Sequence, residues 1–124
     1  MWYICIMKYI GLEQYKLSDS RNNSLVLVDI DLLISKLKVD TPEYFVGEST
    51  NNPYSIRRIT NAMDYVKKNL GNSGCLEASL ISVEDGRLGV IDGRHRIIAA
   101  KKIGYTHIYV DIPNKYKKVL YGIT

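Results

Sequence analysis

The stretch VIDGRHRIIAAKKIG, residues 90–104, decides how the rest of the chain is arranged around it. An apolar run ends at Asp92 and Gly93, and a helical pattern follows as far as Gly104. We therefore expect a strand that turns directly into a helix, with Asp92 or Gly93 as the N-cap. Gly104, preceded by two lysines, is typical of the residue at which a helix ends.

The charges at the start of this helix are unusual. A helix N-terminus carries a partial positive charge and favours acidic residues, yet Arg94, His95 and Arg96 occupy the first turn. Each exposed cation there costs about 0.3–1 kcal/mol. A bound anion would reverse this cost, because first-turn N–H groups and arginine side chains both bind phosphate oxygens. The sequence therefore predicts an anion site, in which His95 could also transfer a proton near neutral pH.

An alternative interpretation of these charges needs no ligand. Arg94 and Arg96 would form ion pairs within the protein, and His95 would pack in the core with its hydrogen bonds satisfied. The candidate acidic partners are Asp92, Asp85 and Glu77.

Hydrophobic periodicity outside this stretch predicts the remaining elements. Asp-Gly between two apolar runs indicates a hairpin, and Asp31 is the expected cap of the first helix. The pattern indicates an α+β (α/β) fold with a mixed sheet flanked by helices. The expected strands are residues 2–7, 25–30, 76–83, 87–91 and 105–112, and the expected helices are 32–38, 56–70 and 94–103.

Length and composition indicate one globular domain. The 124 residues are 46% hydrophobic and carry a net charge of +4, which permits an acidic partner without requiring one. We expect a single domain over residues 1–124, with 1–20 and 113–124 as peripheral extensions. Cys5 and Cys75 match no metal or redox spacing, so a reducing, cytoplasmic setting is expected. The N-terminus lacks a basic leader and is too short to span a bilayer, so no membrane partner is expected.

Two further regions are candidates for function. The helix at 56–70 carries Arg57, Arg58, Lys67 and Lys68, which form either a solvated face or a surface for nucleic acid or another partner. Residues 39–54 contain several helix breakers and are expected to be a long loop, of a length typical of functional lids. No carboxylate cluster typical of a metal site occurs in sequence. One would form at Asp29, Asp31 and Asp92 only if the fold brought them together.

The segment DGRHRIIAAKKIGYTHIYVDI, residues 92–112, resembles the signature of the ParB/sulfiredoxin-like superfamily. The shared features are a Gly-x-His-Arg turn after a strand, a helix with an Ala-Ala pair, and a closing strand. The resemblance implies a nucleotide-phosphate pocket in which Gly93, His95 and Arg96 contact phosphates and Arg94 lies adjacent. His95 and Asp92 are the candidate catalytic residues. The resemblance leaves open whether the ligand is ATP, ADP or CTP, and whether Mg²⁺ accompanies it.

Two departures from the family narrow the expected activity. Sulfiredoxins carry their catalytic cysteine between the glycine and the histidine, whereas this chain has Arg94 there, so sulfinic-acid reductase activity is not expected. Chromosome-partitioning ParB proteins add DNA-binding and dimerisation domains after this module. The present chain ends 12 residues after Ile112, so sequence-specific centromere binding is not expected either.

Three functions remain open. The first is a stand-alone ParB-like domain that binds nucleotide or nucleic-acid phosphate, with or without nuclease or NTPase activity. The second is a small-molecule kinase resembling the free-serine kinases of the superfamily, with Glu43 or Glu48 as general base. The third is a binding-only protein from a phage or plasmid that inhibits a host nucleic-acid-processing or defence protein. The oligomeric state is left open.

Overall fold

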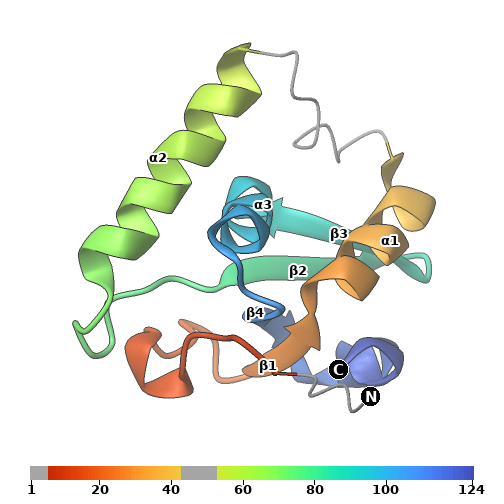
Figure 1. The fold of residues 1–124 in the computed structure, drawn as a ribbon. Helices are drawn as coiled ribbons and strands as arrows, with labels where there is room; N and C mark the ends of the chain where they lie inside the picture. Colours follow the sequence, from red (N-terminus) through yellow and green to blue (C-terminus); the bar gives the residue numbers. More distant parts are fainter. Residues whose placement is uncertain (1–5, 43–52) are drawn as a thin grey trace, which may run out of the picture.

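The computed structural model describes residues 6–42 and 53–124, and these form a mixed sheet with helices packed around it (Figure 1). The sheet has four strands in the order β1-β4-β2-β3 within the described residues. This confirms the expected α+β fold with a mixed sheet flanked by helices. In chain order the elements are η1 (Leu12–Gln14), β1 (Asn23–Asp29), α1 (Ile30–Asp40), α2 (Pro53–Asn69), β2 (Ser79–Glu84), β3 (Arg87–Asp92), α3 (Arg94–Ile103), β4 (His107–Pro113) and η3 (Asn114–Ile123).

The strand register places β4 in the middle of the sheet and β1 and β3 at its two edges. β4 pairs antiparallel with β1, with Asp29 opposite His107, and parallel with β2. β2 and β3 pair antiparallel and form the expected hairpin. Its turn contains Asp85 at φ 51° and Gly86 at φ 75°, the pair of positive angles that a type I′ turn requires. Asp92 therefore ends an edge strand, directly before α3.

The cap of α1 differs from the prediction. Asp29, not Asp31, is the N-cap, and its carboxylate accepts a hydrogen bond from the Leu32 N–H at 3.0 Å. Asp31 lies inside the first turn and forms an ion pair with Lys101 at 3.1 Å. Both aspartates are suitable capping residues, and the helix begins earlier because Ile30 is buried in the core.

Other element boundaries also differ from the prediction. Ile6 and Met7 are not in a strand, and the rest of the strand expected at 2–7 lies outside the described residues. β2 begins later than predicted because Leu76 instead forms an isolated parallel bridge with Tyr15. β4 begins two residues late, at His107. Of the loop expected at 39–54, residues 43–52 lie outside the described residues, and α1 and α2 extend up to each side of them.

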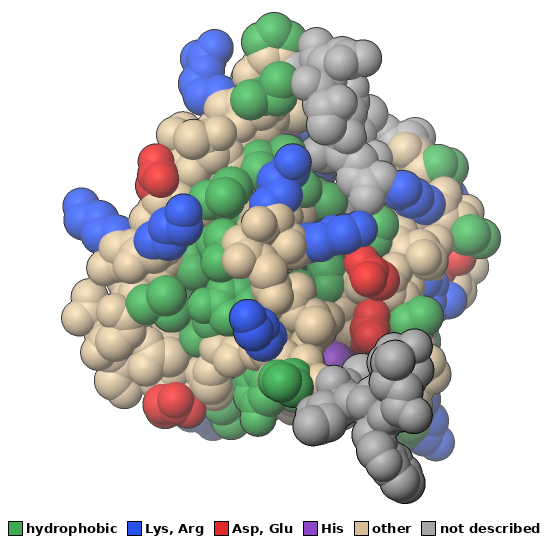
Figure 2. Space-filling view, viewed as in Figure 1, with side chains coloured by type: hydrophobic (Ala, Val, Ile, Leu, Met, Phe, Trp, Pro, Cys, Tyr) green, Lys and Arg blue, Asp and Glu red, His purple; other side chains and the backbone are tan. Residues whose placement is uncertain are grey.

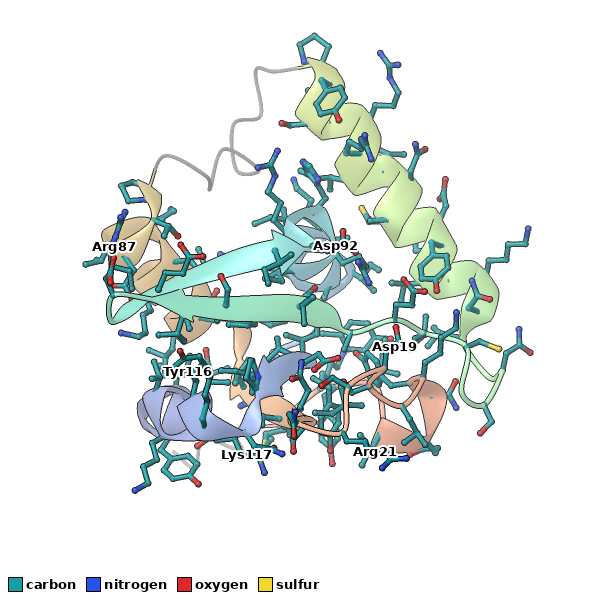
Figure 3. The ribbon with its side chains drawn as sticks, turned by 180° about the vertical axis from the view of Figure 1, so that it is seen from behind. Asp19, Arg21, Arg87, Asp92, Tyr116 and Lys117 are labelled. Atoms are coloured by element: carbon teal, nitrogen blue, oxygen red, sulfur yellow. The ribbon has the colours of Figure 1, made fainter. Side chains whose placement is uncertain are left out.

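The core lies between the sheet and the helices. α1 lies in front of β2 and β3 in Figure 1 and behind them in Figure 3, so it covers one face of the sheet. Of the segments expected as peripheral extensions, 1–20 and 113–124, the described residues 6–20 and 113–124 both contribute buried side chains. Leu120 and Ile123 of η3 belong to the main core. Ile10 and Tyr15 form a second cluster with Val66 of α2 and with Leu76, which precedes β2.

α2 contacts the rest of the molecule through a narrow face. Of the apolar residues that recur along the helix predicted at 56–70, Ile59 and Val66 are buried, whereas Ile56 and Leu70 are exposed. The helix packs mainly against α3 and leaves its other sides to solvent (Figure 1). Figure 2 shows apolar side chains between the two helices and Lys and Arg side chains around them.

Candidate functional site

The junction between β3 and α3 is built around Gly93. This residue is the N-cap, in the left-handed conformation at φ 95°. Its carbonyl accepts hydrogen bonds from the N–H groups of Arg96 and Ile97 and from the buried Ser79 hydroxyl at 2.8 Å. A Cβ atom here would lie 2.7 Å from Ser79 Oγ and 2.9 Å from the Arg96 guanidinium. The position therefore requires glycine both for its backbone angle and for its close neighbours.

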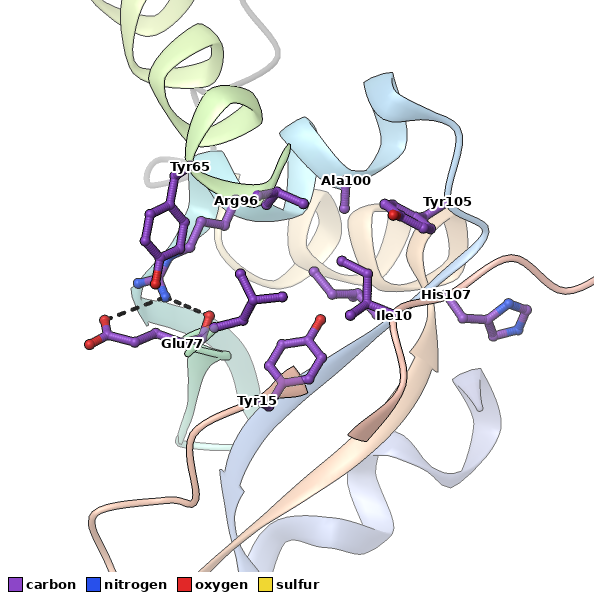
Figure 4. Close-up of a pocket in the computed structure, with 11 residues that line it drawn as sticks. Ile10, Tyr15, Tyr65, Glu77, Arg96, Ala100, Tyr105 and His107 are labelled. Carbon is purple, nitrogen blue, oxygen red and sulfur yellow. Dashed lines mark hydrogen bonds and ion pairs between the residues drawn. The ribbon is translucent and has the colours of Figure 1, made fainter. Parts of the chain in front are cut away.

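Arg96 folds back over this turn and is held within the protein. Its guanidinium donates to the Glu77 carbonyl at 2.8 Å, and the Glu77 carboxylate lies at 3.9 Å (Figure 4). It also donates to the Asp92 carboxylate at 3.0 Å. The side chain is only 18% exposed. The ion-pair interpretation is therefore confirmed for Arg96. Asp92 and Glu77 offset part of the charge conflict that the sequence shows at the start of α3.

His95 does not fit the interpretation of a satisfied core histidine. Its Nε2 atom is buried and has no hydrogen-bond partner among the described residues. The Tyr54 ring meets the imidazole edge-on, with centroids 6.5 Å apart, and the Arg58 guanidinium lies 4.9 Å from the centre of the same Tyr54 ring. Burial, followed by the charges of Arg94 and Arg58, lowers the pKa of His95 below its ordinary value of 6.5. A neutral imidazole is therefore favoured at physiological pH, and it can donate or accept a proton.

A groove of about 550 Å³ lies between α2 and the start of α3. This is within the range of pockets that hold small organic ligands. Figure 3, seen from the side opposite to Figure 1, shows Asp92 at the end of β3 with α2 beside it. The groove is lined by Lys16, Arg58, Asn61, Ala62, Tyr65, Glu77, Asp92, Gly93, His95 and Arg96.

The charges in the groove form a chain. Lys16 donates to the Glu77 carboxylate at 3.2 Å, Glu77 also faces Arg96, and Arg96 pairs with Asp92. The hydrogen bond to Glu77 raises the pKa of Lys16, so Lys16 stays a cation. With Arg58 on the α2 side, the groove is lined by three cations and two carboxylates. The groove is therefore positive on balance, which favours anions.

The structure brings together some of the residues predicted from sequence and not others. Asp92, Gly93, His95, Arg96 and Arg58 line the groove, and Arg94 is close enough to His95 to influence its pKa. The remaining α2 cations predicted as a partner surface are outside the groove lining. These are Arg57, Lys67 and Lys68. Glu43 and Glu48, the candidate kinase bases, lie outside the described residues.

Sequence reasoning missed several groove residues. Lys16, Asn61, Ala62 and Tyr65 were not predicted as site residues, and Glu77 was considered only as an ion-pair partner. Lys16 and Glu77 lie 61 positions apart in the chain, and the bridge between Tyr15 and Leu76 brings them side by side. No local sequence pattern signals this pairing.

The three aspartates considered as a metal site do not converge. Asp29 and Asp31 lie at the start of α1, where they line a small pocket with His107 and Lys101. Asp92 ends β3 at the opposite edge of the sheet. Within residues 6–42 and 53–124, no three or more His, Cys, Asp or Glu side chains are placed to hold a metal ion.

A second cavity behind Arg96 is too small for a ligand. It has a volume of about 20 Å³, enough for one water molecule, and Tyr15, Tyr65 and Tyr105 lie around it (Figure 4). Burial raises the pKa of Tyr15 to about 12, so this hydroxyl stays protonated and cannot act as a base near neutral pH.

Comparison with protein-family models, with curated proteins and with solved structures gives no match to this chain. The described part of the chain has no helix with the length and apolar character needed to cross a bilayer.

Proposed function

We propose that the chain binds the phosphate group of a nucleotide or nucleic acid in the groove between α2 and the start of α3. The observation that carries this proposal is the convergence, on one hollow of about 550 Å³, of a helix start with Lys16, Arg58 and Arg96. The first turn of a helix directs N–H groups outward and favours negative charge. The three cations come from separate parts of the chain, so the fold assembles this positive groove.

The groove residues have distinct roles in this proposal. Gly93 lets the Ser79 hydroxyl and the Arg96 guanidinium lie against the turn, and Arg58 supplies a guanidinium from the α2 side. Arg96 is held by Glu77 and Asp92, so it gives the turn its shape and adds positive charge without reorienting. His95 provides the buried Nε2 as a further hydrogen-bonding group.

Catalysis in this groove would depend on His95 and Asp92. A neutral His95 can accept a proton from a water or hydroxyl that attacks a phosphate. The Asp92 carboxylate is 73% exposed and lies 3.0 Å from the Arg96 guanidinium. Hydrolysis of nucleotide or phosphodiester is therefore the reaction class proposed. None of the described residues favours the free-serine kinase or the inhibitor.

Calorimetric titration tests the binding proposal. Pyrophosphate, ATP, ADP and CTP are each titrated with Mg²⁺ and with EDTA against the wild type, Arg58→Ala and Lys118→Ala. Lys118 is an exposed lysine of η3, so its removal changes the net charge equally without touching the groove. We expect Arg58→Ala to weaken binding about tenfold, as for a lost charged hydrogen bond, and Lys118→Ala to leave it unchanged. Absence of binding, or equal losses in both variants, contradicts the proposal.

Phosphate release tests the catalytic part separately. We expect His95→Asn to abolish release of phosphate from a bound nucleotide, or cleavage of an oligonucleotide, and to weaken binding much less, because Lys16, Arg58 and the start of α3 remain in the groove. If this variant releases phosphate as fast as the wild type, His95 is not a catalytic residue.

A further inference from the structure

The positive charge of the molecule is concentrated in one pair of packed helices. α2 and α3 carry eight Lys and Arg residues and one carboxylate, Asp64, whereas the rest of the chain has nine against twelve. The two helices pack against each other. The excess positive charge therefore extends along both helices and is not confined to the groove. Such an extended positive surface suits a ligand that carries many negative charges.

One side of α2 carries both aromatic and polar side chains. Its residues are spaced four, three, four and three apart, so they follow one stripe of a helix with 3.6 residues per turn. Three of them, Arg58, Asn61 and Tyr65, line the groove. We call this set the α2 stripe; it consists of Tyr54, Arg58, Asn61, Tyr65 and Lys68.

The α2 stripe is longer than a single nucleotide needs. The 14 residue steps from Tyr54 to Lys68 rise about 21 Å along the helix axis. The Tyr54 ring is 51% exposed and carries the Arg58 guanidinium at 4.9 Å from its centre. An exposed aromatic ring beside a guanidinium is a surface on which a base can stack.

We propose that the ligand of the groove is a single-stranded nucleic acid that lies along the α2 stripe. This rests on the proposed function and names its substrate class. Bases stack on the Tyr54 and Tyr65 rings, and phosphates contact Arg58, Lys68 and the start of α3. A duplex would hide its base faces from the tyrosines, and an acidic protein surface would supply nothing flat to stack on them.

Binding of matched ligands tests the substrate class. Fluorescence anisotropy compares oligodeoxyuridine and oligouridine of about ten nucleotides with a duplex of equal length, and calorimetry adds CTP and pyrophosphate. We expect the single strands to bind at least about tenfold more tightly than the duplex or CTP. The tighter of the two single strands identifies the preferred sugar.

Two adjacent lysines provide a matched pair of variants. Lys68 belongs to the α2 stripe, whereas Lys67 lies about 100° around the helix from it and half a turn away from Arg58. We expect Lys68→Ala to weaken single-strand binding and to lower the salt dependence by about 0.7 in log–log slope, the value for one phosphate contact of a single strand. Lys67→Ala should change neither, and both variants should bind pyrophosphate as the wild type does.

The stacking contact has its own variants. We expect Tyr54→Leu to weaken single-strand binding about tenfold, and Tyr54→Phe, which keeps the ring, to bind as the wild type does. Equal losses in Lys67→Ala and Lys68→Ala, equal binding of the duplex, or equal affinity for CTP and the oligonucleotides would each overturn this inference while leaving the phosphate groove intact. If neither pyrophosphate nor any nucleotide or oligonucleotide binds, the proposed function fails as well.

Discussion

Two neighbouring residues at the start of α3, His95 and Arg96, differ in how the structure accommodates them. Arg96 is compensated, because its guanidinium contacts the Asp92 carboxylate and the Glu77 carbonyl. His95 has a buried nitrogen without a partner in the described part of the molecule. A local charge conflict that is only partly compensated is typical of a functional position. This is why the groove, rather than any other hollow, is the proposed site.

Replacement of Gly93 by alanine is expected to lower the free energy of unfolding by at least about 2 kcal/mol. The substitution forces an L-residue to φ 95° and places a Cβ 2.7 Å from Ser79 Oγ. Urea denaturation measures the loss. Gly86→Ala is the control, because Gly86 has φ 75° and nothing within 4 Å of the added Cβ, so only the backbone strain of about 1 kcal/mol remains. Equal losses in the two variants would show that Ser79 does not restrict this turn.

His95 is expected to make the protein less stable as the pH falls. Its folded pKa lies below 6.5, so the unfolded chain takes up a proton that folded His95 resists. The contribution of the neutral imidazole to the free energy of unfolding is fully present above pH 6.5. It decreases as the pH falls and becomes constant below the pKa of His95 in the folded protein. Urea denaturation at about pH 7.5 and about pH 5.5 should show a larger loss for the wild type than for His95→Asn. A proton NMR titration midpoint for His95 above 6.5 would contradict this.

At the scale of single elements, α1 shows how two neighbouring aspartates take different roles. Asp29 accepts the Leu32 N–H and caps the helix, whereas Asp31 makes an exposed ion pair with Lys101. Exposed ion pairs contribute little, but a cap satisfies a backbone N–H that would otherwise lack a partner. The two positions therefore give a direct comparison between a cap and a surface charge.

Asp29→Ala is expected to lower the free energy of unfolding by about 1 kcal/mol, and Asp31→Ala by clearly less. Asp29→Ser should recover most of the loss, because a serine hydroxyl can also accept the Leu32 N–H. Chemical denaturation gives the three values, and hydrogen exchange at the Leu32 amide reports the cap itself. If Asp31→Ala proves the more damaging change, the assignment of Asp29 as the cap is wrong.

At the scale of the whole molecule, local sequence patterns predicted the helices and strands better than they predicted how these pack together. The Asp85-Gly86 turn and the stop at Gly104 follow from residues that must adopt positive φ, and both are found where predicted. The central place of β4 could not be predicted. Its alternating buried residues, Ile108, Val110 and Ile112, would serve an edge strand covered on one face equally well.

Only the part of the candidate site that is formed by residues adjacent in the sequence could be predicted. The helix start at residues 92–96 was found because its charges conflict with the helix dipole. Lys16 and Glu77 reach the groove through the pairing of distant segments, and Arg58, Asn61 and Tyr65 line it only because α2 lies beside the start of α3. Spacing along the sequence identifies a helix face but not the surface against which that face lies.

The main core is completed by the end of the chain, and this can be tested. Leu120 of η3 is fully buried with residues of the sheet and α1, whereas its neighbour Tyr121 is 64% exposed. Removing a buried leucine side chain loses apolar burial and leaves a cavity, so Leu120→Ala is expected to cost about 3 kcal/mol of unfolding free energy. Tyr121→Ala should cost about 0.5 kcal/mol or less. Thermal and urea unfolding of both variants measure the difference. A loss at Leu120 as small as that at Tyr121 would mean that η3 lies on the core without being part of it.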